Sequence, residues 1–133
     1  MSIQFSTDLR NGQNDQITTK IGANGLLDIF TGSPPGSCDS ADSGTKLVEF
    51  ICNAAFAPSS TSGTITINPY TSVTALATGT AGYFRFKTSG GAQKVQGTVT
   101  ASGGGGDLTL DNTSINSGQL VSMNTQTITA GGA

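Results

Sequence analysis

The carboxylates are the residues in this sequence with the most scope for acid–base chemistry, because it contains no histidine. Without histidine, neither Ser-His-Asp nor Cys-His nucleophilic catalysis can be assembled, and a His-ligated zinc site is excluded. The eight Asp and Glu residues leave a two-carboxylate hydrolase as the enzymatic alternative. Asp107 and Asp111 form the best pair, since they flank Leu108–Leu110 and would share one face of a strand. Both also adjoin Gly- or Asn-rich turns, where Asp is common, so we predict turn positions for them and no enzyme.

Two loop segments resemble ligand-binding motifs, and each departs from its motif. Asp39 and Asp42 lie in a loop rich in Pro, Ser and Gly over residues 32–44 and offer oxygen ligands for calcium, but no Asp-x-Asp-x-Asp-Gly run or closing Glu accompanies them. The four glycines Gly103–Gly106 are followed by an Asp and a strand, whereas a phosphate-binding loop continues with Lys-Ser/Thr and a helix. We therefore predict no metal and no cofactor.

Charge and hydropathy narrow the range of partners. The net charge is -2 and charged residues make up 11%, against a typical value of about 25%, so no polybasic surface exists for nucleic acid. No apolar run approaches the roughly 18 residues that span a bilayer, and the amino terminus has neither a basic nor an apolar stretch, so we expect neither export nor a membrane partner. Without export, Cys38 and Cys52 are expected as reduced thiols, with a disulfide under oxidising conditions as the alternative.

The first part of the chain predicts one amphipathic helix over about residues 6–21. Ser6 or Thr7 is suited to cap its amino end, and Gly22 or Gly25 can end it. The apolar residues that set the helical spacing are Phe5, Leu9, Ile17 and Ile21.

After this segment the apolar period changes to two, which is typical of strands. In the segment Tyr83–Lys87 the two phenylalanines should face the core, while Tyr83, Arg85 and Lys87 should face water. The glycines of Thr88–Ala92 predict a tight hairpin to the next strand. We expect a single domain, 1–133, that is mainly β: an antiparallel β-sandwich or jelly-roll over about 26–130 with one N-terminal α-helix. The expected strands are Leu26–Phe30, Lys46–Cys52, Gly63–Ile67, Ser72–Leu76, Tyr83–Lys87, Lys94–Thr100, Asp107–Leu110 and Leu120–Thr129.

Blocks of sequence along the chain resemble one family of known proteins. They are Ile3–Thr7, Arg10-Asn11, Ile21-Gly22, Thr31-Gly32, Pro35, Cys38, Ala41–Thr45, Gly79–Arg85, Gln96–Ala101, Gly103–Asn112, Ile115, Gly118-Gln119 and Thr127–Gly131. These blocks are similar to small virion structural proteins of siphovirus-like tailed phages, the capsid decoration or cement proteins. The segment Asn53 to Ala77 lies outside the resemblance. The chain also lacks the second cysteine that family members often carry near Gln93, so no family disulfide is transferred to Cys38.

The resemblance implies a non-enzymatic protein that binds the outer capsid lattice and stabilises it. Its expected partners are the major capsid protein and further copies of itself, as a trimer, and its expected location is the virion surface after synthesis in the host cytoplasm. The alternative is a tail or fibre-associated module that contacts the host surface, although 6% aromatic residues and no tryptophan leave few platforms for stacking on sugars. Loops and termini are the usual contact surfaces, so we expect the interface to involve Ile3, Phe5, Leu9, Arg10, Pro34, Pro35, Asp39 and Asp42.

Overall fold

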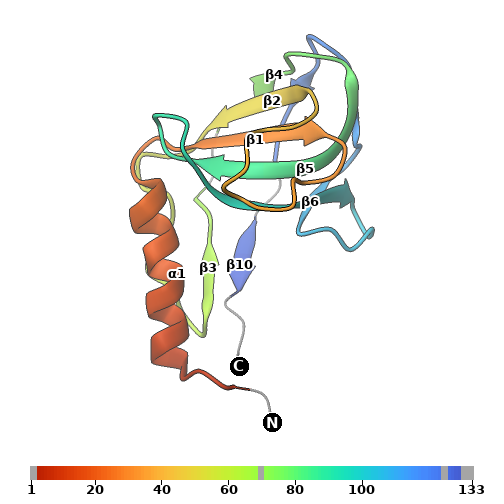
Figure 1. Ribbon diagram of the computed structural model, residues 1–133. Helices are drawn as coiled ribbons and strands as arrows, with labels where there is room; N and C mark the ends of the chain where they lie inside the picture. The colour runs from red at the N-terminus through yellow and green to blue at the C-terminus, as the bar shows by residue number, and fades with distance from the viewer. Residues whose placement is uncertain (1–2, 69–70, 124–125, 130–133) are drawn as a thin grey trace.

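The computed structural model describes residues 3–68, 71–123 and 126–129, and Figure 1 shows their arrangement. One curled sheet forms the body, and a helix extends from one end of it with one short strand pair alongside the helix. The fold is mainly β with an N-terminal helix and is consistent with a β-sandwich-like arrangement, which confirms the predicted class.

Helix α1 spans Thr7–Ile21 and has the predicted caps. The Ser6 Oγ atom accepts a hydrogen bond from the Leu9 N–H at 3.2 Å, and Gly22, at φ +74°, ends the helix. The predicted apolar stripe is confirmed only near the carboxyl end, where Ile21 is buried. Phe5 lies before the helix and is exposed, as is Leu9, so the first part of the helix does not pack on the core.

The main sheet has the strand order β2-β1-β5-β6-β7, and β8 pairs with the start of β5. Its first four strands are antiparallel neighbours, and the predicted hairpin between β5 and β6 is confirmed by two backbone hydrogen bonds of 2.9 Å between Thr88 and its partners Ala92 and Gly91. The strand bounds are β1 Leu26–Thr31, β2 Lys46–Ile51, β5 Gly79–Lys87, β6 Gln93–Ala101, β7 Leu108–Leu110 and β8 Ser114–Ile115.

The four consecutive glycines allow an unusual connection between β6 and β7, which are parallel neighbours. Parallel strands ordinarily need a long crossover, but here residues 102–107 suffice. Gly103 and Gly105 have φ values of +85° and +82°, and a Cβ on Gly104 or Gly106 would lie 2.8 Å from the Thr100 side chain. Glycine is therefore required both for the backbone reversal and for the close approach to Thr100.

Two smaller ladders complete the fold. Strand β3 (Thr64–Thr66) pairs with β10 (Thr127–Thr129), and β4 (Val73–Thr74) pairs with β9 (Leu120–Val121). The single strand predicted over Leu120–Thr129 is wrong, because its two ends pair with different partners; its residues 124–125 lie outside the described part. The short strand β8 was not predicted, since two residues carry no periodicity.

The core lies on the inner face of the sheet. Phe86 is fully buried there, with the Phe56 and Phe84 rings edge-on to it at centroid separations of 5.2 and 5.5 Å. The helix contacts β3 and β6, and β4 contacts β2, so these elements cover the apolar face. The main buried apolar residues are Ile21, Leu27, Ile29, Leu47, Val48, Phe50, Phe56, Ile65, Ile67, Phe84, Phe86, Val99, Leu108, Leu110 and Ile115.

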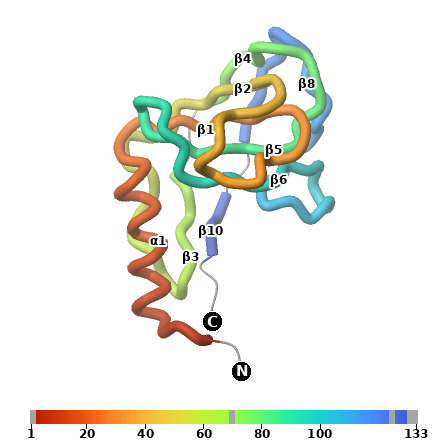
Figure 2. The backbone as a smooth tube through the Cα atoms, viewed as in Figure 1, coloured from red at the N-terminus to blue at the C-terminus, as the bar shows by residue number. Residues whose placement is uncertain are grey.

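On the opposite face of the sheet the side chains of β5 are not exposed to water, so the prediction of a water-facing side for β5 is wrong. Tyr83 and Arg85 are 0% exposed and Lys87 is 5% exposed. The reason is the segment between β1 and β2, which folds back across β5 and β6 in both Figure 1 and Figure 2. A long loop thus covers the polar side chains of β5.

Candidate functional site

The segment of residues 32–45, called here the covering loop, is fastened to the sheet at both ends. At its base, the Thr31 N–H donates to the Thr45 carbonyl at 3.0 Å, and the Thr45 N–H donates to the Thr31 Oγ1 atom at 3.0 Å. Near its carboxyl end, the Ser43 N–H donates to the Tyr83 hydroxyl at 2.9 Å, and that hydroxyl donates to the Ser43 carbonyl. The Tyr83 ring stacks on Phe30 with centroids 4.8 Å apart, so the hydroxyl is held in a fixed position.

Arg85 holds the middle of the covering loop. Its guanidinium donates to the Ser40 carbonyl at 2.7 Å, to the Asp42 carboxylate at 2.9 Å and to the Gln96 side-chain oxygen at 3.0 Å. Gln96 in turn donates to the Pro35 carbonyl at 2.9 Å. A buried guanidinium is costly unless its donors are paired, and these partners supply that pairing. The loop therefore has one preferred conformation, set by side chains of β5 and β6.

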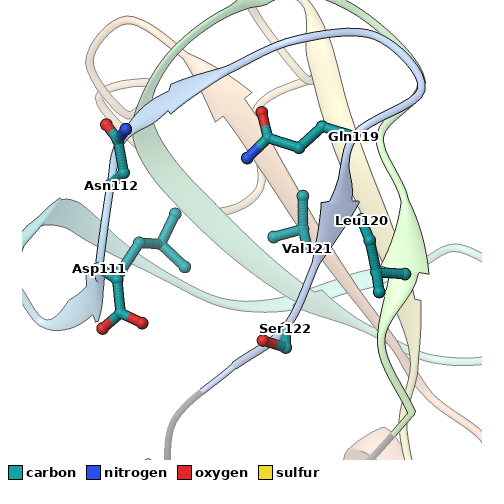
Figure 3. Close-up of a pocket in the computed structure, with 7 residues that line it drawn as sticks. Asp111, Asn112, Gln119, Leu120, Val121 and Ser122 are labelled. Carbon is teal, nitrogen blue, oxygen red and sulfur yellow. The ribbon is translucent and has the colours of Figure 1, made fainter.

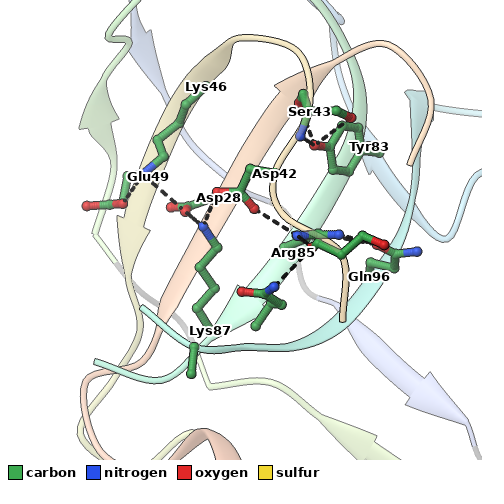
Figure 4. Close-up of polar contacts among 12 residues, drawn as sticks. Asp28, Asp42, Ser43, Lys46, Glu49, Tyr83, Arg85, Lys87 and Gln96 are labelled. Atoms are coloured by element: carbon green, nitrogen blue, oxygen red, sulfur yellow. Dashed lines mark hydrogen bonds and ion pairs between the residues drawn. The ribbon is translucent and has the colours of Figure 1, made fainter. Parts of the chain in front are cut away.

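A cluster of charged side chains lies beside Arg85 under the same loop, as Figure 4 shows. The Lys87 Nζ atom lies 2.8 Å from the Asp28 Oδ2 atom and 2.7 Å from the Asp42 Oδ2 atom. The Lys46 Nζ atom lies 3.2 Å from the same Asp28 oxygen and 2.8 Å from the Glu49 carboxylate. Asp28 is fully buried in the middle of β1. The cluster joins β1, β2 and β5 to the loop.

The environment shifts the pKa values of these groups in different directions. Burial raises the pKa of Asp28, Lys87 opposes that shift, and the neighbouring Glu49 adds to it. For Asp42, burial raises the pKa, but Lys87 and Arg85 together outweigh it and the net shift is downward. Burial lowers the pKa of Lys87, yet Asp28 and Asp42 raise it above its ordinary value. The cluster thus holds one carboxyl with a raised pKa, Asp28, and two with lowered pKa values, Asp42 and Glu49.

The amino-terminal segment is the second predicted contact region. Ile3 is 78% exposed, Phe5 38% and Leu9 49%, so three apolar side chains meet solvent within a short stretch. Arg10 is half-buried, and it packs so tightly over Gly63 that a Cβ there would lie 2.3 Å from the guanidinium. The structure therefore places the three apolar residues on the surface and Arg10 against the body of the protein.

Polar side chains, rather than an apolar stripe, hold the middle of the helix. Asn14 is 1% exposed and donates to the Gly63 carbonyl at 2.6 Å. The Asn11 side-chain oxygen accepts from the Gly63 N–H at 2.8 Å, and the Asp15 carboxylate accepts from the Ser60 N–H at 2.8 Å. These bonds fix the helix, and with it the exposed segment, to the turn before β3.

The two predicted contact regions lie apart on the molecule. Figure 1 shows the amino-terminal segment at the end of α1 that is distant from the sheet, whereas the covering loop lies on the sheet itself. In the loop, Pro34 and Pro35 are half-buried and Asp39 is exposed. The Asp42 carboxylate is engaged by Lys87 and Arg85. That these residues form an interface stays a prediction, and one flat interface would not include both regions.

The carboxylates that were weighed as a hydrolytic pair occupy separate environments. Asp107 accepts hydrogen bonds from the Thr98 N–H at 2.9 Å and its hydroxyl at 3.1 Å, and so braces the turn before β7. Asp111 lines the surface pocket drawn in Figure 3, where it is the one ionisable side chain among the described lining residues. The other lining residues are Leu110, Asn112, Gln119, Leu120, Val121 and Ser122. This pocket lacks the second carboxyl that glycoside hydrolysis requires.

The cysteines and possible ligand groups give no further site. Cys38 and Cys52 are free thiols, and burial, together with Asp28, raises the pKa of Cys52 to about 12. Within the described ranges, no group of three His, Cys, Asp or Glu side chains is placed to hold a metal ion. No helix in that part of the chain is long and apolar enough to cross a membrane.

Sequence reasoning missed the charge cluster, although one signal pointed to it. Asp28 interrupts the otherwise apolar run Leu26–Phe30, and a charged residue in a strand buried on both faces needs a partner. Arg85 and Lys87 alternate on β5 in a way that allows both to reach it. What could not be read from the sequence is that residues 32–45 would cover all of them. Comparisons of the chain with protein-family models, with curated proteins and with solved structures found no match.

Proposed function

We propose that this protein is a structural component of a tailed-phage virion, a capsid decoration or cement protein that binds the outer capsid lattice and stabilises it. The sequence blocks described above, concentrated after Gly79, support the choice of family. The observation that carries the binding role is the run of exposed apolar side chains at Ile3, Phe5 and Leu9. Exposed apolar side chains gathered in one segment are typical of a protein-binding surface.

The energetics favour a lattice partner. Fully burying an exposed side chain of this kind contributes about 1.5–3 kcal/mol, and Phe5 and Leu9 are already partly covered, so the three together give a modest contact per copy. On a repeating lattice, identical contacts made by linked copies add through multivalency, and a symmetric trimer at a local symmetry axis would supply that linkage. The proposed partners are therefore the major capsid protein and further copies of this chain, on the virion surface.

The covering loop supports the same role in a second way. Its clamps to Arg85, Tyr83 and Gln96 leave little conformational entropy to lose when the loop meets a partner. The few charged side chains also reduce the desolvation cost of a large contact, since 11% of residues are charged. A rigid body with neutral surfaces is suited to bracing a shell against internal pressure.

The proposal is tested on capsids that lack this protein. Adding purified protein should restore resistance to heat and chelation, and it should sediment with the capsids. An Ile3→Ser, Leu9→Ser variant should bind at least tenfold more weakly, whereas the matched control Leu120→Ser, at a position 69% exposed on β9, should bind as the wild type does. Capsids that keep full resistance without the protein would refute the bracing role.

A cryo-EM reconstruction of the particle separates the proposal from its rival. Copies on the order of hundreds, arranged on the shell, are expected for lattice decoration. A handful of copies at the tail would replace the capsid proposal with a tail or fibre role.

A further inference from the structure

Lys87 and Asp28 form a buried pair whose placement is suited to covalent chemistry. The Lys87 Nζ atom lies 2.8 Å from the Asp28 Oδ2 atom, with the two side chains 6% and 0% exposed. We propose that these side chains condense into an intramolecular isopeptide bond, which links β5 covalently to β1. The proposal concerns the chain itself and does not depend on the function proposed above.

The pair is positioned by the sheet. Lys87 lies opposite Leu26 and Arg85 lies opposite Asp28 in the β1–β5 ladder, so Lys87 and Asp28 are diagonal neighbours on the same face. The Lys87 Nζ atom also lies 5.3 Å from the centre of the Phe30 ring, which packs beside it. Neither side chain needs to move far for the nitrogen to meet the carboxyl group.

The amine approaches Asp28 outside the usual directions of a hydrogen bond. Lys87 donates a hydrogen bond to Asp42 at 2.7 Å, whereas neither Asp28 oxygen has a hydrogen-bond partner among the described residues. The attraction between the two opposite charges, together with the packing around them, therefore holds the nitrogen against this carboxyl. The Asp28 Cγ atom is bonded to the oxygen that the nitrogen contacts. A small movement therefore brings the nitrogen to about 3–3.5 Å from Cγ, the separation from which the new bond can form.

The site also offers a driving force for the reaction. Two reacting groups held in this way behave as though present at an effective concentration of about 10⁵–10⁸ M. The ion pair is buried, and its replacement by a neutral amide removes the cost of keeping two charges away from water. The covering loop excludes bulk water, which would otherwise compete in the reverse reaction.

The condensation balances without an oxidant or a further reactant. A proton first passes from the Lys87 ammonium to the Asp28 carboxylate, giving a neutral amine and a neutral acid. The nitrogen lone pair then forms a bond to the Asp28 Cγ atom, and the carbonyl electron pair moves onto its oxygen. A second proton leaves the nitrogen and reaches the hydroxyl oxygen. The electron pair on the other oxygen then re-forms the carbonyl, the C–O bond to the hydroxyl oxygen breaks with its electron pair on that oxygen, and one water departs.

Neighbouring charged groups are placed to assist these steps. The Asp42 carboxylate, 2.7 Å from the nitrogen, is the nearest acceptor for the second proton. The Lys46 ammonium, 3.2 Å from the Asp28 Oδ2 atom, adds positive charge beside this carboxyl group and can stabilise the negative charge that develops on the group as the bond forms. Burial raises the pKa of Asp28, and Glu49 raises it further against the effect of Lys87, which reduces the cost of the first proton transfer.

Intact-mass spectrometry of two variants tests the proposal directly. Lys87→Arg and Lys94→Arg carry the same substitution, at a buried and at an exposed lysine, so the two polypeptides have identical composition. If Lys87 is cross-linked in the protein, the Lys87→Arg variant will be heavier than the Lys94→Arg variant by one water, about 18 Da. Equal masses would overturn the proposal.

A tryptic map of the wild-type protein gives a second readout that does not require either variant to fold. An acylated Lys87 resists trypsin, so the map should contain residues 21–46 joined to residues 86–94 in one branched peptide. Separate peptides ending at Lys87, or a water loss that maps to other residues, would mean that the cluster is only a set of ion pairs. Either result would refute the isopeptide bond.

Discussion

Replacing Arg85 by Met removes the centre of the clamp under the covering loop and should destabilise the protein strongly. The methionine keeps an apolar stem of similar length, so the change isolates the guanidinium. That group is 0% exposed and binds the Ser37 and Ser40 carbonyls, the Asp42 carboxylate and Gln96. All four acceptors lose the guanidinium at once, and Asp42 keeps Lys87 as its charged partner.

The expected loss in the free energy of unfolding is about 3–5 kcal/mol, the cost of removing one partner from a buried charged network. A simple addition of charge-assisted hydrogen bonds, at about 1.5–3 kcal/mol each, would give more. We expect the smaller loss because Ser37, Ser40 and Asp42 are exposed residues. Their oxygens can form hydrogen bonds with water when the loop moves away from the sheet. The loop should therefore open locally before the rest of the protein unfolds.

Urea denaturation and hydrogen exchange measure the two parts of this prediction. The Arg85→Met variant should show the lower unfolding free energy and faster exchange at the Ser40 and Ser43 amides, which are hydrogen-bonded in the loop. Lys94→Met is the matched control, at an exposed site on β6, and should stay within about 0.5 kcal/mol of the wild type. A loss below about 1 kcal/mol, or an unchanged exchange pattern, would refute the clamp.

Three further predictions follow from other parts of the structure. Gly63→Ala should destabilise the protein by about 1 kcal/mol in thermal unfolding, because Gly63 has φ +75°, and the Arg10 guanidinium, 2.3 Å from the position of a Cβ, would also have to move. Asp42 has a lowered pKa in the folded state, so its ionised form stabilises the protein above the unfolded pKa of about 3.9, and that contribution disappears as the pH falls through the folded pKa. Asp42→Asn should therefore flatten the fall in the urea midpoint between about pH 5 and pH 2. Cys52, buried and with a pKa of about 12, should resist thiol reagents at neutral pH in the native protein, whereas the half-buried Cys38 should react first.

Each of these predictions has a control within the chain. Gly12→Ala, in a helix position with open space around it, should not destabilise and should gain up to about 1 kcal/mol. Asp39→Asn changes an exposed carboxylate in the same loop and should leave the acid limb of the stability curve as in the wild type. In denaturant, Cys52 should react as fast as Cys38. If Cys52 reacted as fast as Cys38 in the native protein, the carboxyl end of β2 would be open to solvent and the prediction would be wrong.

Local chemistry in the sequence predicted the elements that depend on near neighbours. Ser6 caps the helix because its side chain reaches an N–H three residues away, and the Thr88–Ala92 turn closes a hairpin between adjacent strands. Short apolar segments separated by turn residues likewise located β1, β2, β5 and β6. The segment Leu120–Thr129 failed because its two halves pair with strands far away in the chain, which no local pattern encodes.

For the functional regions, the sequence by itself determined that histidine chemistry is absent, because the composition contains no histidine. It also determined that the apolar residues Ile3, Phe5 and Leu9 lie in one short stretch. Only the tertiary structure decided that Arg85 and Lys87 are buried. Alternation along a strand assigns a side chain to a face, but whether that face meets water depends on what packs over it. Here residues 32–45 cover it, and so bring Asp42 to Lys87 and Asp28 across a long separation in the chain.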